Sequence, residues 1–237
     1  MTAVAAPGPA AAEQAAAPVG RTARVTVVRL LALAVGMLVL PNLAILGLHL
    51  LAQRGAGAPS VQVPIKNFAE VDRSLWRGAA PGADGYEALA AHGVTTVIDL
   101  RAEDGIRVDE ALLARLGISR LHLPLRDGQS PTDGQVDRFL AAVRASPGRA
   151  FVHCGAGVGR TGTMSAAYLV KTGQATPREA LLRNLSVGPP SLEQLAFASG
   201  LDAYGRVERP APLMVAISRA LDAPRRAWVH VRGSYVR

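Results

Sequence analysis

The chain has 237 residues, a formal net charge of +8 and one cysteine, Cys154, which leaves room for one domain with flanking segments and excludes a disulfide within the chain. Residues 60–204 hold 15 basic and 15 acidic residues, so the basic excess lies on the flanks. No basic face is therefore expected on the central domain, and we predict no nucleic-acid partner.

The N-terminal region is predicted to be disordered and then membrane-spanning. Residues 1–20 are rich in Ala and Pro with Glu13 as their only charge, and we assign disorder to residues 1–24. Residues 30–52 carry no formal charge, and a helix of that length spans about 34 Å, enough for a bilayer core. We assign one transmembrane helix to residues 25–53, with a kink at Pro41.

This apolar segment is interpreted as an uncleaved signal anchor. It is longer than the apolar part of a signal peptide, typically about 7–15 residues, and Pro59 would directly follow a cut after Ala58. Three arginines precede the span, at positions 21, 24 and 29, whereas Arg54 and Lys66 follow it. The positive-inside rule therefore predicts a single-pass protein whose folded domain is extracytoplasmic.

After a linker at residues 54–60, strands alternate with helices over residues 61–205, which predicts an α/β domain with a mostly parallel central sheet flanked by helices. The expected strands are 94–100, 119–123 and 150–153; the expected helices are 86–92, 109–116, 132–146, 161–170, one from 176, and 191–204. Three of these helices open with capping-box spacing: Thr132 with Gln135, Thr176 with Glu179, and Ser191 with Gln194.

Residues 153–162 read His-Cys-Gly-Ala-Gly-Val-Gly-Arg-Thr-Gly and predict an oxyanion site. Cys154 is nucleophilic only as a thiolate, and inward-pointing backbone N–H groups at a helix N-terminus lower the pKa of a thiol. Arg160 offers a fork of donors to two phosphate oxygens. Thr161 places a hydroxyl near the sulfur. The expected phosphate-binding loop is Gly155, Ala156, Gly157, Val158, Gly159 and Arg160.

Each part of this motif also has an ordinary structural interpretation. A lone cysteine after a strand is usually a small buried apolar residue, and a glycine-rich strand-to-helix connection is often only a turn. The combination of thiol, glycines and arginine in one loop favours the catalytic interpretation.

The motif resembles the His-Cys-x5-Arg-Ser/Thr signature of the cysteine-dependent protein tyrosine phosphatases, and the resemblance covers about residues 60–204. Residues 75–81 and 97–101 are similar to compact dual-specificity members. The resemblance implies that His153 orients the loop and helps to keep the thiolate pKa low. It also implies that Arg77 and Arg101 lie near the loop, although either could instead be a surface ion-pair partner.

The resemblance further implies a carboxylic acid on an upstream loop, which protonates the leaving group. Asp127 is the preferred candidate because it follows a predicted strand, lies 27 positions before Cys154 and has Gly128 beside it. A turn aspartate next to glycine is the alternative interpretation. Asp133 and then Asp104 are the next candidates. Gln194 could position the hydrolytic water, but its place in a capping box also explains it.

These features predict a membrane-anchored phosphatase that hydrolyses phosphotyrosine, and also phosphoserine or phosphothreonine, through a phosphocysteine. No cofactor and no metal are expected, because the five histidines show no ligand spacing. The loop lacks the basic residues frequent in phosphoinositide phosphatases, although a membrane anchor favours a lipid. Alternatives are a phosphatase of phosphoinositides or other phosphomonoesters, a non-catalytic phospho-binding module, another thiol enzyme acting on an oxyanion, and a membrane adaptor.

The C-terminal extension at residues 206–237 is basic and contains a predicted short amphipathic helix over residues 213–221. Such a segment either contacts anionic lipid head groups or packs on the domain. The oligomeric state is not predicted.

Overall fold

The computed structural model describes residues 19–55, 57, 59–103, 108–202 and 209–235, with side chains described within 24–223. The chain divides into two units, residues 1–42 and 43–237. Helix α1 (Val19–Gln53) contains Pro41. Over Arg24–Gln53 it is long and apolar enough to cross a membrane, as judged by length and composition.

Helix α1 begins earlier than the sequence pattern indicates. Residues 1–18 lie outside the described part of the chain, but residues 19–24, which we predicted to be disordered, are helical. Arginine and alanine are good helix formers, so the helix extends over them ahead of the apolar run. In the second unit, Ile45 is buried and His49 Nδ1 lies 2.5 Å from the carbonyl oxygen of Leu185.

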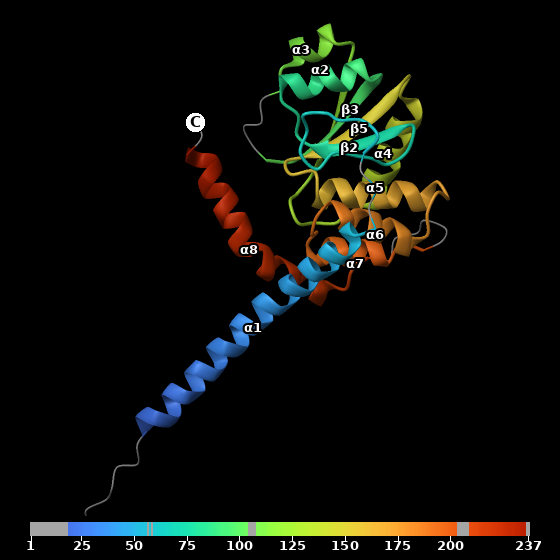
Figure 1. Ribbon diagram of the computed structural model, residues 1–237. Helices are drawn as coiled ribbons and strands as arrows, with labels where there is room; N and C mark the ends of the chain where they lie inside the picture. Colours follow the sequence, from blue (N-terminus) through green and yellow to red (C-terminus); the bar gives the residue numbers. More distant parts are fainter. Residues whose placement is uncertain (1–18, 56, 58, 104–107, 203–208, 236–237) are drawn as a thin grey trace, which may run out of the picture. The chain divides into compact units, whose positions relative to one another are not determined.

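The centre of the second unit is a five-stranded sheet with the order β1-β2-β5-β3-β4. β1 pairs antiparallel with β2, and the other pairs are parallel, which confirms the mostly parallel sheet (Figure 1). The strands are β1 (Ala69–Glu70), β2 (Leu75–Ala79), β3 (Val94–Arg101), β4 (Ser119–Leu125) and β5 (Arg149–Cys154). β1 and β2 were not predicted, because neither has a run of β-branched residues.

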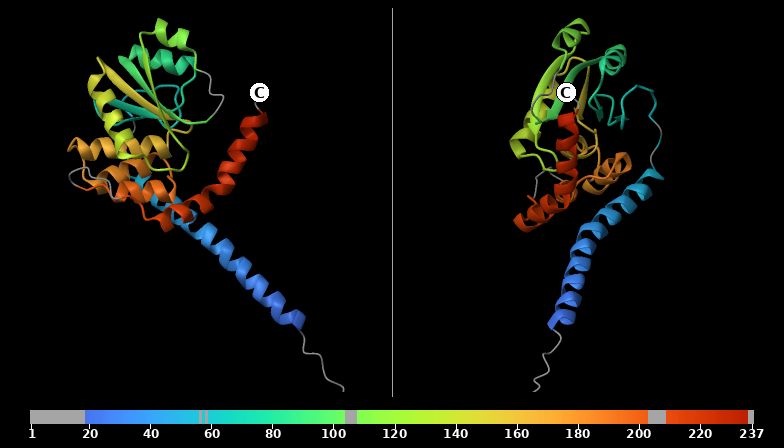
Figure 2. Two further views of the ribbon diagram at one scale, coloured as in Figure 1. Left: turned by 180° about the vertical axis from the view of Figure 1, so that it is seen from behind. Right: turned by 90° about the vertical axis from the view of Figure 1, so that its left-hand side faces the viewer.

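Helices cover both faces of the sheet. They are α2 (Ala83–Ala91), α3 (Glu110–Arg115), α4 (Asp133–Ala145), α5 (Gly159–Lys171), α6 (Pro177–Val187) and α7 (Leu192–Ser199). The last helix, α8 (Pro212–Tyr235), packs against α7. α2 and α3 lie on one face and α4 to α7 on the other (Figure 2). All three predicted capping boxes form with both hydrogen bonds. α7 ends before Gly200, earlier than predicted, and α8 is much longer than the predicted helix.

Alternating side chains of the central strands fill the two layers of the core. Leu75, Ile98 and Val152 are buried on the side of α4 and α5, whereas their neighbours Trp76, Val97 and Phe151 are buried with α2 and α3. Two covered faces explain why the strands read as continuous apolar runs. The carboxyl ends of the parallel strands then meet at one edge, where ligands bind in open α/β sheets.

Candidate active site

Strand β5, in the middle of the sheet, delivers Cys154 to this edge. Cys154 pairs in register with Ala79 on β2, and the preceding His153 pairs with Asp99 on β3. The Cys154 thiol is free and only 3% exposed. A cysteine at this place is flanked by two parallel strands, so the loops that follow those strands surround the sulfur.

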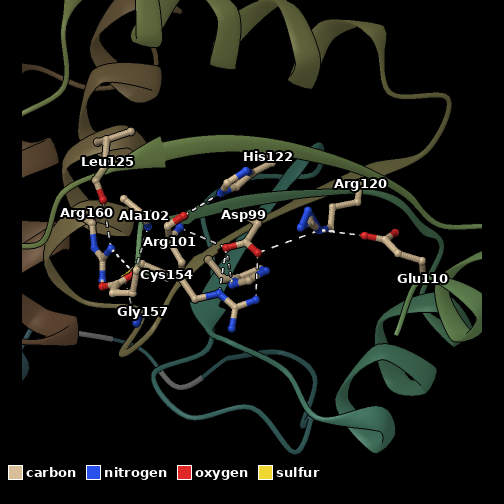
Figure 3. Close-up of polar contacts among 12 residues, drawn as sticks. Asp99, Arg101, Ala102, Glu110, Arg120, His122, Leu125, Cys154, Gly157 and Arg160 are labelled. Carbon is tan, nitrogen blue, oxygen red and sulfur yellow. Dashed lines mark hydrogen bonds and ion pairs between the residues drawn. The ribbon is translucent and has the colours of Figure 1, made fainter. Parts of the chain in front are cut away.

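The loop after Cys154 folds back over the sulfur. The Gly157 N–H donates to Cys154 Sγ over 3.3 Å (Figure 3). Gly157 has φ +72°, and a Cβ there would lie 2.2 Å from the carbonyl carbon of Gly78. Only glycine meets both conditions. Helix α5 begins at Gly159, two residues before the predicted start, so Arg160 lies in its first turn, where the helix end favours an anion.

Arg77 braces the loop from β2, which confirms one of its two predicted interpretations. Its Nη2 donates to the carbonyl oxygens of Gly157 at 2.8 Å and Val158 at 3.3 Å. Its Nη1 donates to Asn184 Oδ1 at 3.4 Å. Burial lowers the pKa of Arg77 to about 10, which still leaves it protonated at neutral pH. The loop carbonyls are therefore turned away from the sulfur and towards a cation.

Arg160 stands at the centre of the predicted catalytic groups. Its Nη1 donates to the Leu125 carbonyl oxygen at 3.0 Å (Figure 3). Its Nε lies 3.5 Å from Asp127 Oδ1. Burial acts to lower the pKa of Arg160, but neighbouring negative groups, chiefly Glu103, raise it. The preferred acid, Asp127, is thus brought to the predicted phosphate-binding arginine. Asp133 is exposed in the first turn of α4, and Asp104 lies outside the described residues.

Glu103 is a site residue that our reading of the sequence missed. Its Oε1 accepts from Arg160 Nη2 at 2.6 Å and its Oε2 from Arg160 Nη1 at 3.0 Å. This two-pronged contact fixes the plane of the guanidinium. Its position in the chain could have identified it as a site residue, because Glu103 follows the carboxyl end of β3, as Asp127 follows that of β4. Parallel strands bring such residues to one edge.

His153 is fully buried beneath the loop. Its Nδ1 lies 3.8 Å from Asp99 Oδ1, and burial lowers its pKa to about 4. At neutral pH His153 is therefore uncharged, so it contributes to the site by its position and not by a positive charge. Arg101 makes a two-pronged contact with Asp99 at 2.9 and 2.8 Å, so it is an ion-pair partner and does not brace the loop (Figure 3).

Thr161 and Gln194 complete the residues singled out by the sequence. Thr161 is buried, and its hydroxyl has no hydrogen-bond partner among the residues that the structure describes. Gln194 forms the predicted capping box with Ser191, and its Nε2 also donates to the Gln129 carbonyl oxygen at 3.2 Å. Gln194 therefore contacts the loop that carries Asp127 as well as capping α7.

Arg77 also lines a cavity of about 350 Å³, together with residues of α5 and α6 that include Ser165, Arg183 and Asn184. Cys154 does not line this cavity, so the chemistry of the site is not located there. Within the described ranges, no group of three or more His, Cys, Asp or Glu side chains is arranged to hold a metal ion.

Comparisons with known proteins identify relatives of the domain. The family model described as "DSP-PTPase phosphatase fused to NAD+ Kinase" matches residues 62–200. The human dual specificity protein phosphatase CDC14C is 40% identical over 92 residues, covering 38% of this chain and 20% of the relative. The probable chloroplastic NAD kinase 2 of Oryza sativa subsp. japonica is 34% identical over 102 residues, covering 40% and 10%. The chain thus spans about a fifth or less of these relatives' length.

Among solved structures, the chain is similar to P. aeruginosa TpbA, with a TM-score of 0.49 and 24% sequence identity. That match covers 69% of this chain and 98% of the other.

Proposed function

The chain belongs to the family of DSP-PTPase phosphatases fused to NAD+ kinase, within the cysteine-dependent protein tyrosine phosphatase superfamily, and on this premise we propose that it hydrolyses phosphomonoesters through a phosphocysteine at Cys154. The proposal rests on one observation: three groups converge at one edge of the sheet. They are the Cys154 thiol under its folded-back loop, the buried Arg160 in the first turn of α5, and the Asp127 carboxylate 3.5 Å from Arg160.

In the first step, the Cys154 thiolate attacks phosphorus and the P–O bond to the leaving group breaks. The loop amides and Arg160 hold the non-bridging oxygens, whose negative charge they stabilise. The Gly157 N–H already points at the sulfur and stabilises its anionic form. A phosphocysteine results, and the leaving oxygen carries the electron pair of the broken bond.

Asp127 supplies the proton that this leaving oxygen needs. Its carboxyl is about one third exposed and lies beside Arg160 Nε, so it borders the place of the bound phosphate. In the second step, Asp127 accepts a proton from water, the water oxygen attacks phosphorus, and the P–S bond breaks. Inorganic phosphate leaves and the thiolate is restored.

For the substrate we favour phosphotyrosine, with phosphoserine and phosphothreonine as further substrates. The five residues between Cys154 and Arg160 include no lysine or arginine. Gly155 and Ala156 are exposed, and neither carries a charged side chain. A multiply charged lipid head group would find no additional cation in this part of the loop, whereas a single aryl phosphate needs only Arg160 and the amides.

The test is hydrolysis by the full chain in detergent, without added metal and under reducing conditions. Phosphotyrosine peptide, phosphothreonine peptide and phosphoinositide are presented in parallel, with Cys154→Ser as the control. Peptide turnover that Cys154→Ser abolishes is the expected result. Turnover of lipid alone would keep the mechanism and overturn the substrate class. Phosphate binding without turnover of any ester would indicate a binding module.

We also propose that α1 anchors the protein in a membrane, with the phosphatase domain extracytoplasmic. Apolar side chains along α1, including Val28, Leu33 and Met37, are exposed, unlike those of a helix in a soluble core. Resistance to alkaline extraction would support the anchor. Accessibility of the domain to protease added outside intact expressing cells whose outer layers have been made permeable tests the orientation, and a protected domain would reverse it.

A further inference from the structure

The loop that carries Asp127 is held by the first turn of a helix more than 60 positions later in the chain. We define the acid loop as residues 126–131, between β4 and α4. Three residues of α7 and its cap hold three consecutive residues of this loop. Ser191 Oγ donates to the Gly128 carbonyl oxygen at 2.7 Å, and Gln194 Nε2 donates to that of Gln129 at 3.2 Å.

Glu193 makes the third of these contacts. Its Oε1 accepts from both the backbone N–H and the hydroxyl of Ser130, each at 3.0 Å. The Glu193 side chain is only 6% exposed. A buried carboxylate is costly unless its oxygens are paired, so the contact with Ser130 strongly restricts where the acid loop can lie.

Helix α8 in turn holds Glu193. The Glu193 backbone N–H donates to the buried hydroxyl of Ser218 at 2.9 Å, and Arg219 Nε lies 4.0 Å from Glu193 Oε2. Asp222, one turn after Ser218, approaches the acid loop itself, since a Cβ on Gly128 would lie 3.1 Å from Asp222 Oδ2. Helix α8 begins beside α7 (Figure 1). The C-terminal extension is therefore packed against the support of the acid loop.

We propose that Glu193 is a positioning residue for Asp127, and that α8 keeps Glu193 in place, so that the C-terminal helix contributes to proton transfer. This inference rests on the proposed function, because it assigns a role within the same reaction. Asp127 directly precedes residues 128–130, whose backbone Ser191, Gln194 and Glu193 hold, so a single peptide unit separates Asp127 from the held segment. A loop released from Glu193 would leave Cys154 and Arg160 in place but would no longer hold the acid near the leaving oxygen.

Two phosphate esters with different leaving groups separate a loss of proton transfer from other effects of Glu193→Ala. A strongly basic leaving group needs the acid, whereas a weakly basic one departs without it. Phenyl phosphate has a leaving group about as basic as that of tyrosine, with a pKa of about 10, and nitrophenyl phosphate has a much less basic one. In the full chain in detergent, Glu193→Ala should lower kcat/KM about 10- to 100-fold for phenyl phosphate and much less for nitrophenyl phosphate.

A matched control comes from α6. Glu179 Oε2 accepts from the backbone N–H and the hydroxyl of Thr176 at 2.8 and 2.9 Å, the same pair of contacts that Glu193 makes with Ser130. Glu179→Ala should therefore leave the ratio of kcat/KM for the two esters unchanged. Glu193→Gln keeps an acceptor oxygen for Ser130 and should recover part of the loss.

Ser218→Ala tests the contribution of α8 and remains informative if Glu193→Ala fails to fold. It should change the ratio in the same direction by a smaller factor. In the Asp127→Asn background, Glu193→Ala should no longer alter the ratio, because the group that it positions is gone.

Equal losses for both esters, or a full effect of Glu193→Ala on top of Asp127→Asn, would overturn the inference and leave the proposed function intact. Absence of turnover of either ester by the unsubstituted chain would overturn the proposed function, and the inference with it.

Discussion

Arg77 Nη2 donates to the carbonyl oxygen of Gly157 at 2.8 Å, so a side chain on one strand sets the shape of a loop that follows its neighbour. The same nitrogen also reaches the Val158 carbonyl oxygen. With both carbonyls turned towards Arg77, the amides of the loop are free to face the sulfur and a bound phosphate. The loop after Cys154 therefore takes its shape from a buried cation on the neighbouring strand.

Arg77→Lys tests whether the loop depends on the planar shape of the Arg77 side chain or only on its charge. A lysine keeps the charge but lacks the planar fork that reaches two carbonyl oxygens. Losing one charge-assisted hydrogen bond should lower the free energy of unfolding by about 2 kcal/mol. The misplaced loop should lower kcat/KM about 100-fold. Urea unfolding and ester hydrolysis measure the two effects, and unaltered hydrolysis would show that the loop holds its shape without Arg77.

The loop glycine offers a second test. Gly157→Ala introduces a Cβ into the backbone of Gly78 at a positive φ, whereas Gly173→Ala meets a similar φ of +70° with nothing within 4 Å. A positive φ alone costs about 1–2 kcal/mol in a residue other than glycine. Gly173→Ala should therefore lower the free energy of unfolding by about this amount and keep full activity. Gly157→Ala should be less stable than Gly173→Ala and lose hydrolysis. Equal stability of the two variants would contradict the close approach.

Local patterns predicted much of the fold because they depend on neighbouring residues. The capping boxes at Thr132, Thr176 and Ser191 join residues three positions apart, and all three form. The apolar run from Val94 predicts a buried strand because both faces of the sheet are covered.

Contacts across the sheet were not predictable in the same way. Glu103 meets Arg160 across 57 positions, and Glu193 meets Ser130 across 63. No local pattern records such pairs, since they depend on the strand order and on the edge where loops converge. Even Arg77, which the resemblance placed near the loop, acquires its role only from its register with Val152 on β5.

Because His153 is buried and uncharged, we expect the free energy of unfolding to fall in mild acid. Burial lowers its pKa from 6.5 to about 4. The unfolded chain takes up a proton near pH 6.5, but the folded chain does not until about pH 4. Stability that is complete above pH 6.5 is therefore lost as the pH falls towards 4, in total by about 3 kcal/mol.

His153→Asn does not titrate and should flatten this dependence. Urea unfolding at several pH values between 6.5 and 5 isolates the effect, because most carboxylates titrate below that range. Equal slopes for the two proteins in this range would show that His153 takes up its proton over the same pH range in the folded and the unfolded chain.

The contact between Glu103 and Arg160 leads to the last prediction. Two parallel hydrogen bonds fix the guanidinium plane, and hydrogen bonds from Arg160 keep the pKa of Glu103 low against the opposing effect of its burial. An amide in place of the carboxylate keeps one acceptor and turns an N–H group towards the other donor. Glu103→Gln should therefore leave Arg160 able to rotate.

Because Arg160 acts on the phosphoryl oxygens and not on the leaving group, Glu103→Gln should lower kcat/KM by a similar factor for phenyl and nitrophenyl phosphates, about tenfold. Glu193→Ala, in contrast, should affect the two esters unequally. Measuring both esters with both variants thus assigns each glutamate to one part of the reaction. If Glu103→Gln instead tightened the binding of inorganic phosphate and left kcat unchanged, Glu103 would be a competitor for Arg160 and would have no role in orienting it.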